Sequence, residues 1–392
     1  MRPLEGINVV SVEQAVAAPF ATRQLADLGA RVIKIERPRE GDFARAYDTT
    51  VHGLSSYFVW LNRSKESLTL DLKRSEAGPV LERLLARADV FVQNLAPGAA
   101  DRLGVRGADL RARHPRLVVC EMSGFGSSGP YAQKKAYDLL VQAEAGVVSL
   151  TGTPDTPSKV GISIADIAAG MYAYSGILTA LLARARTGGG TLVEVSLFDA
   201  LAEWMGAPAY YTAYGGSAPK RTGAHHASIA PYGPFRTRDG QTIFFAIQNA
   251  REWSRFCTDV LGWPGLADDD RFRTNTRRVE NRDALHLAIE STLGTLTEDD
   301  LLRRLERASI AHARMNTVAD FLSHPQLVER DRWTDVGTPA GLVRTLAPPV
   351  QMTGVTPAIG PVPALGQHTD AILEELSIDR DTIAAWRRDG VI

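Results

Sequence analysis

One carboxylate, Asp166, stands inside an otherwise apolar and small-residue run, VGISIADIAAG at 160–170. A long uncharged stretch follows it, so Asp166 falls where a helix is expected to begin. Aspartate is a favoured N-cap residue, and capping alone accounts for a charge at this point. An accessible carboxylate with an ordinary pKa of about 3.9 is ionised at neutral pH and can attack an acyl group. A cap and a nucleophile are therefore both open interpretations, and they are compatible.

Other motifs that could carry chemistry are incomplete. GFGSSG at 124–129 matches GxGxxG, but Pro130 follows the last glycine, where a dinucleotide site needs a helix to open. A loop beside an active site is the better interpretation of this segment. His225 and His226 are adjacent, which rarely lets both bind one ion, and the chain has no CxxC or HExxH. Neither a metal site nor a GxSxG hydrolase elbow is predicted.

The first two hundred residues alternate between strand and helix patterns. Continuous apolar runs indicate strands at 7–13, 31–36, 67–72, 89–95, 116–123 and 191–196, and amphipathic helices are expected at 18–29 and 76–88. Strands that are buried on both faces read as such runs, and helices between them imply parallel pairing. The predicted fold class is α/β, with a parallel sheet in the large domain.

The pattern changes near residue 215, where glycine, proline and polar residues predict a loop. A hairpin turning at 238–240 and charged helices near 251–261, 280–293 and 297–307 then predict a smaller α+β domain. Short β-like pieces and a helix near 367–376 close the chain. The expected organisation is a large domain at 1–200, a linker at 201–225, a small domain at 226–325 and a return to the large domain at 326–392.

Composition excludes several classes of partner. The formal net charge is −1, with 44% hydrophobic and 23% charged residues, so no basic excess points to nucleic acid. The uncharged stretch 167–183 is at the short limit for a membrane span, and RARTGGG behind it is typical of a helix end. We expect a buried helix and no membrane partner. Two unpaired cysteines and an N-terminus without a signal-like apolar core predict a cytoplasmic protein.

Seven long segments, in this order, resemble the class III CoA-transferases, the family of formyl-CoA transferase and carnitine CoA-transferase. They are LEGINVVSVEQAVAAPFATRQLADLGARVIKIERP, LTLDLK, NLAPGAADRLG, SGFGSSGPY, VGISIADIAAG, IAPYGPF and LGQHTDAIL. The resemblance covers essentially the whole chain. It implies an open Rossmann-like domain joined to a smaller domain, an interlocked homodimer, and no permanently bound cofactor, because coenzyme A (CoA) arrives as part of the substrate.

The resemblance also assigns residues. The family's catalytic aspartate falls on Asp166. Its CoA contacts fall on Val16, Ala17, Arg37, Leu70, Asp71, Leu72, Lys73, Asn94, Leu95, Ala96, Arg102, Lys135, Ala136, Tyr137 and Asp138. Four of these are cations, which can pair with the phosphates of CoA.

The implied mechanism is acyl transfer by a carboxylate. Asp166 attacks a donor thioester to give an acyl-aspartyl anhydride, and the released CoA thiolate converts it into an aspartyl-CoA thioester. An acceptor carboxylate then takes the CoA. Backbone N–H groups near Val16 and Ala17, or in a glycine-rich loop, are candidates to stabilise the oxyanions.

Three other functions stay open. The α-methylacyl-CoA racemases share the superfamily, but their proton-transferring histidine falls on Tyr137. Tyrosine, with a pKa of about 10, is a poor base at neutral pH, which favours transfer over racemisation. If the chain is a non-catalytic acyl-CoA-binding protein, mutation of Asp166 should leave acyl-CoA binding unchanged. A dehydrogenase would rest on GFGSSG alone.

Departures from the family bear on the substrate. The formyl-CoA transferases have a glutamine where this chain has Val16, and a run of four glycines that is absent here, so formate and oxalate are not expected. RTGAHHASIAPYG at 221–233 resembles branches that act on small dicarboxylic acids such as succinate, itaconate, mesaconate, malate or citramalate. Arg221, His225 and His226 are expected to meet a second carboxylate. Carnitine and bulky aromatic acids remain open.

Overall fold

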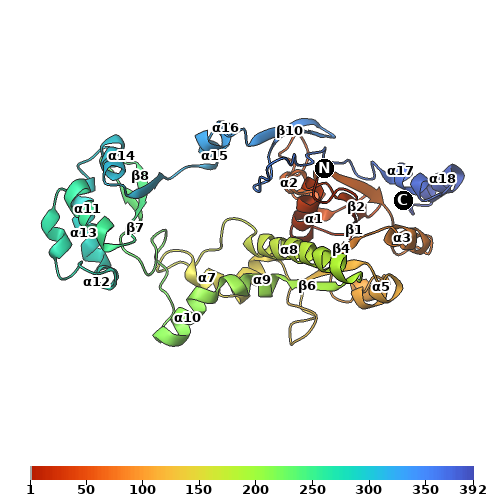
Figure 1. Cartoon of the computed structure of the whole chain (residues 1–392), viewed down its shortest axis with the longest axis horizontal. Helices are drawn as coiled ribbons and strands as arrows, with labels where there is room; N and C mark the ends of the chain where they lie inside the picture. The colour runs from red at the N-terminus through yellow and green to blue at the C-terminus, as the bar shows by residue number, and fades with distance from the viewer. Residues whose placement is uncertain (1) are drawn as a thin grey trace. The chain divides into compact units, whose positions relative to one another are not determined.

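The computed structural model describes residues 2–392, and its contacts divide the chain into two compact units (Figure 1). The larger unit comprises residues 1–145, 161–204 and 326–392, and the smaller unit comprises 146–160 and 205–325. Residues 146–160 thus group with the smaller unit, although the sequence placed them in a domain at 1–200. Their place follows from hydrogen bonds, because the Arg221 side chain donates to the carbonyls of Ser149, Thr153 and Pro154.

All six strands expected in the larger unit form one parallel sheet, in the order β3-β2-β1-β4-β5-β6. This order reverses direction between β1 and β4, and α/β proteins bind ligands at the carboxyl ends of the strands beside that point. The strands are Asn8–Val12 (β1), Arg31–Glu36 (β2), Lys65–Thr69 (β3), Val90–Gln93 (β4), Val118–Ser123 (β5) and Leu192–Ser196 (β6).

Helices connect and cover these strands, and apolar side chains of both fill the core around Phe91, Leu85 and Leu110. The Thr69 N–H at the end of β3 donates to the Thr369 hydroxyl, and the two threonine hydroxyls share a second hydrogen bond, so the returning chain packs on the sheet edge. The helices of this unit are Ala17–Asp27 (α1), Ser56–Asn62 (α2), Ala77–Leu85 (α3), Ala99–Arg102 (α4), Gly107–Arg113 (α5), Asp138–Glu144 (α6), Ile164–Thr187 (α8), Leu197–Trp204 (α9), Thr369–Glu375 (α17) and Arg380–Arg388 (α18), with a hairpin of Trp333–Thr338 (β10) and Gly341–Leu346 (β11).

Helix α8 runs beside α1 (Figure 1), and glycine makes their close approach feasible. A Cβ atom on Gly170 would lie only 2.7 Å from the carbonyl oxygen of Ala17, and one on Gly176 would lie 2.8 Å from Val193 of β6. Among the described helices, α8 alone is long and apolar enough to cross a membrane, and core helices of soluble proteins pass the same test. Packing against α1 and β6 buries part of its apolar surface, while Met171, Tyr172 and Leu182 stay exposed.

The smaller unit has a three-stranded antiparallel sheet in the order β7-β8-β9, with a core that includes Phe235, Phe245 and Trp253. The expected hairpin is present, and it turns through Gly240 at φ +79°. Residues 201–225, expected as a linker, contain the end of α9 and all of α10. The elements are Val147–Leu150 (α7), Gly206–Gly215 (α10), Tyr232–Arg236 (β7), Thr242–Ala246 (β8), Ala250–Arg255 (α11), Asn275–Glu280 (α12), Arg282–Leu293 (α13), Glu298–Arg307 (α14), Ala311–Arg314 (β9) and Val318–Leu322 (α15), and Pro325–Val328 (α16) spans the boundary.

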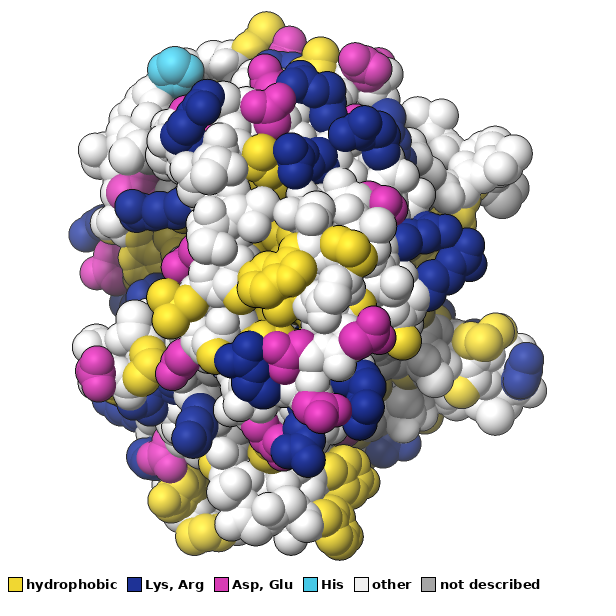
Figure 2. Space-filling model, turned by 90° about the vertical axis from the view of Figure 1, so that its left-hand side faces the viewer, with side chains coloured by type: hydrophobic (Ala, Val, Ile, Leu, Met, Phe, Trp, Pro, Cys, Tyr) yellow, Lys and Arg dark blue, Asp and Glu magenta, His cyan; other side chains and the backbone are white. Residues whose placement is uncertain are grey.

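The face drawn in Figure 2 mixes Lys and Arg side chains with Asp and Glu, and neither sign dominates it. This agrees with the net charge of −1. Several charged side chains of the protein form exposed pairs at short sequence separation, such as Arg277 with Glu280 and Arg303 with Asp300.

Candidate active site

The predicted CoA contacts gather at one edge of the sheet. In the chain they follow the carboxyl ends of β1, β2, β3 and β4 and the loop after β5, and parallel strands bring those ends to the same side. Val16 and Leu70 are themselves buried in the core, so neither presents its side chain to a ligand. Arg37, Lys73, Arg102 and Lys135 are exposed, and Arg37 has one carboxylate, that of Glu40, at 3.7 Å.

Two of the predicted segments are tied together at the reversal point of the sheet. The Asn94 side chain, directly after β4, accepts a hydrogen bond from the Gln14 N–H at 2.9 Å and donates one to the Gln14 carbonyl at 2.9 Å. Ala15, which follows Gln14 in the chain, has a left-handed backbone at φ +62°, and its N–H donates to the Asp42 side chain at 3.0 Å. These bonds fix the backbone immediately before α1.

A buried ionic network lies under this backbone, and sequence reasoning missed it. Lys34 of β2 donates to Asp42 at 2.6 Å, and Lys65 of β3 donates to Glu13 at 2.7 Å, with all four side chains inaccessible to solvent. Burial opposes the charge of Lys34, but Asp42 and Glu13 outweigh it and raise its pKa. The only sequence signal was a lysine between the apolar residues of RVIKIE.

The first two residues of α1 offer N–H groups without helical acceptors, as every helix start does. Val16 precedes the helix, its side chain makes no cap, and Ala17 is the first helical residue. Gly170 packs on the carbonyl of Ala17, so this helix start lies against the turn of α8 that follows Asp166. The arrangement places a cluster of backbone donors and a carboxylate in the same region of the larger unit.

Asp166 is not the N-cap of α8, contrary to the expectation. The helix begins at Ile164, Ser163 stands at the cap position without a side-chain hydrogen bond, and Asp166 lies in the first turn. The first turn still favours a negative charge through the helix dipole. The carboxylate oxygens of Asp166 accept no hydrogen bond from residues 2–392 as described, so its carboxylate is left available for chemistry.

The cap comes instead from Asp138, the first residue of α6. Its Oδ1 accepts hydrogen bonds from the N–H of Ala165 at 2.8 Å and of Asp166 at 3.4 Å, while Oδ2 accepts from Gln142 at 2.7 Å. Asp166 keeps some exposure, but burial of its carboxyl group and the nearby charge of Asp138 raise its pKa to about 7. The expectation of an ordinary, fully ionised aspartate is therefore corrected.

One aromatic residue, Tyr47, lies near the same carboxylate and belongs to a cluster of rings. Tyr47 lies near both Asp166 and Tyr137, and burial, Asp42 and Asp166 raise its pKa to about 12, so it stays a neutral hydroxyl. Its ring contacts Tyr57 edge-on at 5.5 Å and Phe43 at 5.7 Å. Tyr137, where racemases carry their histidine, is 66% exposed.

The GFGSSG segment forms a loop after β5, and no helix follows it directly. The dehydrogenase alternative would need such a helix. A Cβ atom on Gly124 would lie 2.2 Å from the Cβ of Ala136, so this loop packs on the 135–138 segment. Lys134 lies over the ring of Tyr131 and pairs with Glu144. The loop therefore supports the segment that carries Asp138.

The three candidates for a second carboxylate lie in the smaller unit. Arg221 is occupied by the three carbonyls described above. The rings of His225 and His286 lie 4.4 Å apart and are tilted by 37°. Burial and Arg282 lower the pKa of His225, and burial, His225 and Arg282 lower the pKa of His286 to about 4. His226 stacks on Tyr232 at 5.2 Å.

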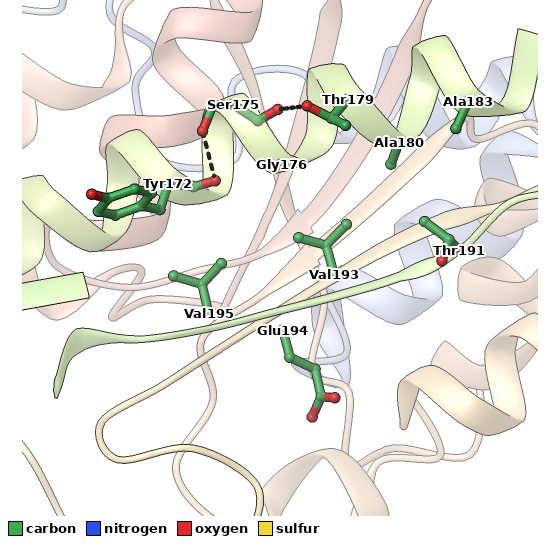
Figure 3. A pocket seen from close by; sticks show the side chains of 10 residues that line it. All are labelled: Tyr172, Ser175, Gly176, Thr179, Ala180, Ala183, Thr191, Val193, Glu194 and Val195. Atoms are coloured by element: carbon green, nitrogen blue, oxygen red, sulfur yellow. Dashed lines mark hydrogen bonds between the residues drawn. The ribbon is translucent and has the colours of Figure 1, made fainter. Parts of the chain in front are cut away.

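A groove of about 460 Å³ runs between α8 and the edge strand β6 (Figure 3), but its groups are poor in chemistry. Ser175 and Thr179 donate their hydroxyls to helix carbonyls, and Glu194 points away from the helix. No group of three or more potential metal ligands occurs within residues 2–392. The candidate site is therefore the edge where Asp166 and α1 meet.

Comparison with known proteins identifies the family of this chain. The profile of CoA-transferase family III matches residues 4–369. The chain belongs to CoA-transferase family III. It is similar to the succinyl-CoA:glutarate CoA-transferase of Mus musculus, with 33% identity over 100% of this chain and 91% of that protein. It is also similar to the acetyl-CoA:oxalate CoA-transferase of Acetobacter aceti, with 37% identity over 84% of this chain and 85% of that protein.

A solved structure agrees with this family. The CAIB/BAIF family protein from Brucella suis superposes with a TM-score of 0.83 at 36% identity, over 96% of this chain and 99% of that one. As a family III CoA-transferase, the enzyme uses CoA thioesters as substrates. The expected family and enzyme class are confirmed.

Proposed function

We propose that this CoA-transferase moves CoA from an acyl-CoA donor to a small dicarboxylic acid, with Asp166 as the nucleophile. The observation that carries the proposal is the Asp166 carboxylate in the first turn of α8, which lies beside the start of α1 and has no hydrogen-bond donor among residues 2–392. A nucleophile needs a free electron pair at the reacting atom, and a carboxylate engaged by donors would be weaker.

The reaction proceeds through three covalent states of Asp166, two anhydrides and one thioester. The Asp166 carboxylate attacks the thioester carbonyl, the C–S bond breaks, and CoA leaves as a thiolate from an acyl-aspartyl anhydride. The thiolate then attacks the aspartyl carbonyl, releasing the donor acid and leaving aspartyl-CoA. The acceptor carboxylate attacks that thioester, and the thiolate finally attacks the acceptor acyl carbon of the new anhydride, which restores Asp166. Each tetrahedral state carries an oxyanion, for which the Ala17 N–H region is the proposed donor.

CoA binding is proposed along the carboxyl ends of the strands. The exposed Arg37, Lys73, Arg102 and Lys135 supply positive charge for its phosphates. The backbone at 70–73 and 94–96 supplies hydrogen-bonding groups beside them. In this proposal Asp138 acts through α8, where its carboxylate is already engaged.

Names of relatives support a dicarboxylate acceptor. They include succinate–glutarate, succinyl-CoA:mesaconate and succinyl-CoA–D-citramalate CoA-transferases. Oxalate also joins the candidates, because a relative at 37% identity is named for it, although Val16 and the missing glycine run had argued against it. A role of Arg221, His225 and His226 toward the second carboxylate stays a proposal. If Arg221→Ala leaves the preference between glutarate and butyrate unchanged, that role is wrong for Arg221.

A homodimer in the cytoplasm is proposed with this activity. Tyr210, Tyr211 and Tyr214 on α10 are 69%, 49% and 84% exposed, and exposed aromatic clusters favour protein contacts. Light scattering after size-exclusion chromatography tests the dimer, and a mass near 42.5 kDa would contradict it.

Mass spectrometry tests the nucleophile. After incubation with succinyl-CoA, we expect a CoA adduct on the peptide that contains Asp166, sensitive to hydroxylamine and absent in Asp166→Ala. Asp199→Ala is the matched control, because Asp199 lies in the first turn of the neighbouring helix α9. If a panel of acyl-CoAs binds but gives no adduct, the racemase or acyl-CoA-binding alternative replaces this mechanism.

A further inference from the structure

A second cavity, of about 630 Å³, lies in the larger unit between α1, α2 and the β10–β11 hairpin. Neither Asp166 nor any of the predicted CoA contacts lines it. Its walls combine five arginines, two tryptophans and several aliphatic side chains, and its lining contains no acidic residue. The volume falls within the range of about 300–1,000 Å³ that is usual for small-molecule sites.

Two of the arginines are built into the floor. Arg63 binds Asp27 with two hydrogen bonds, at 2.9 and 2.7 Å, and its third nitrogen donates to Thr345 and to the Leu346 carbonyl. Arg23 is 7% exposed and lies near the same Asp27, which is its shared counter-ion. Burial, and then the neighbouring charge of Arg63, lower the pKa of Arg23 to about 10. One carboxylate thus serves two guanidinium groups.

The other three arginines have no carboxylate within 4.0 Å among residues 2–392. Arg332 is 8% exposed and donates only to the carbonyls of Ala347 and Pro348. Arg330 is exposed, and Arg344 lies over the Trp333 ring at 5.0 Å. A buried guanidinium without a counter-ion is unfavourable, and an anion entering from solvent would relieve it.

The apolar part of the lining narrows the class of anion. Trp60 is 36% exposed, its ring contacts Phe20 and Arg23, and Val59, Val343 and Leu346 extend the apolar wall. Arginine and tryptophan together bind planar anions, through paired hydrogen bonds and ring stacking. We infer that this cavity is a second binding site, which takes an organic anion with an apolar or planar body, apart from the Asp166 edge.

The probe is anilinonaphthalene sulfonate, an aromatic anion, titrated into the full chain and followed by its own emission and by quenching of tryptophan. We expect saturable binding that Arg330→Ala with Arg344→Ala weakens about tenfold, a loss typical of charge-assisted hydrogen bonds. Arg273→Ala with Arg277→Ala is the matched control, because it removes two exposed arginines from the smaller unit. The uncharged analogue phenylnaphthylamine should bind at least tenfold more weakly than the sulfonate.

Three outcomes overturn the inference. Equal binding in both double variants places the probe elsewhere. Displacement of the probe by CoA in a competitive titration places it at the CoA site. Dissociation of an oligomer in the Arg330→Ala, Arg344→Ala variant, seen by sedimentation velocity, shows that a second copy of the chain occupies the cavity. The double variant keeps the buried Arg332 and Arg63, so we expect it to fold. An unchanged melting temperature of this variant would exclude loss of folding as the cause of weaker binding.

Discussion

The Oδ1 atom of Asp138 accepts a hydrogen bond from the backbone N–H of Ala165 at 2.8 Å, one residue before the proposed nucleophile. A carboxylate from α6 thus caps α8, and its charge lies close enough to Asp166 to help raise the pKa of that group. The two aspartates have different roles because one is engaged by donors and the other is free of them.

Replacing Asp138 by asparagine should separate the cap from the charge. Asparagine keeps an oxygen that can accept from Ala165, but it removes the negative charge that disfavours ionisation of Asp166. The midpoint of the acid limb for aspartyl-adduct formation should therefore move to lower pH, measured by single-turnover mass spectrometry from pH 5 to 9. Asp138→Ala also removes the cap and should cost about 1 kcal/mol of stability. An unmoved midpoint in Asp138→Asn would show that Asp138 has no electrostatic role.

The wild-type enzyme should lose adduct formation as pH falls through about 7. Only the carboxylate form of Asp166 attacks the thioester, and the raised pKa makes it half protonated there. The measurement is the rate of the first turnover with succinyl-CoA in buffers of matched ionic strength. A rate that stays constant down to pH 5 would mean that Asp166 titrates as an ordinary aspartate.

The raised pKa of Asp166 also predicts a pH dependence of stability that is opposite in sign to that of most carboxylates. Because the folded-state pKa of Asp166 is raised, the folded protein binds more protons than the unfolded chain between about pH 4 and 7, and stability falls as pH rises across that window. Asp166→Asn should therefore stabilise the protein at pH 8, by on the order of 1–3 kcal/mol, and have little effect at pH 4. Urea unfolding at both pH values measures this, with Asp199→Asn as the control. Equal effects at both pH values would contradict it.

Loss of a buried lysine should lower the free energy of unfolding more than loss of a surface lysine. Lys34→Met leaves Asp42 without its buried cation, while Glu13 keeps Lys65 at 2.7 Å, and breaking a buried pair costs about 3–5 kcal/mol. Lys134→Met, which removes an exposed pair with Glu144, should cost less than about 1 kcal/mol. Urea unfolding compares the two variants. Similar losses of stability in the two variants would show that the buried network of Lys34 and Asp42 stabilises the fold no more than a surface ion pair does.

Much of the larger unit could be predicted from the sequence because its strands are buried on both faces and read as apolar runs. RVIKIE and DVFVQNL are such runs, and glycine or proline marks several of their connections. The proposed role of Asp166 came from resemblance rather than from pattern, since a lone aspartate at a helix start is most simply a cap.

What the sequence could not reveal depends on contacts between distant segments. Asp138 and Ala165 are 27 residues apart, and nothing in KAYDLL indicates a cap for another helix. The burial of Lys34 and Lys65 was not predicted, because burial of a lysine is a property of the assembled sheet. The cavity at Trp60 and Arg332 likewise joins residues that lie far apart in the chain.

Gly170 offers a direct test of the contact that places α1 beside Asp166. In Gly170→Ala the new Cβ would lie 2.7 Å from the Ala17 carbonyl, which is backbone and cannot turn aside, so α8 must shift away from α1. We expect a loss of about 1–3 kcal/mol in stability and a lower rate of adduct formation, with CoA binding less affected. Gly78→Ala in α3 is the matched control, because it meets no atom within 4 Å and should gain up to about 1 kcal/mol from helix propensity. If both variants behave alike in urea unfolding and in adduct formation, the close packing of α8 on α1 does not position the nucleophile.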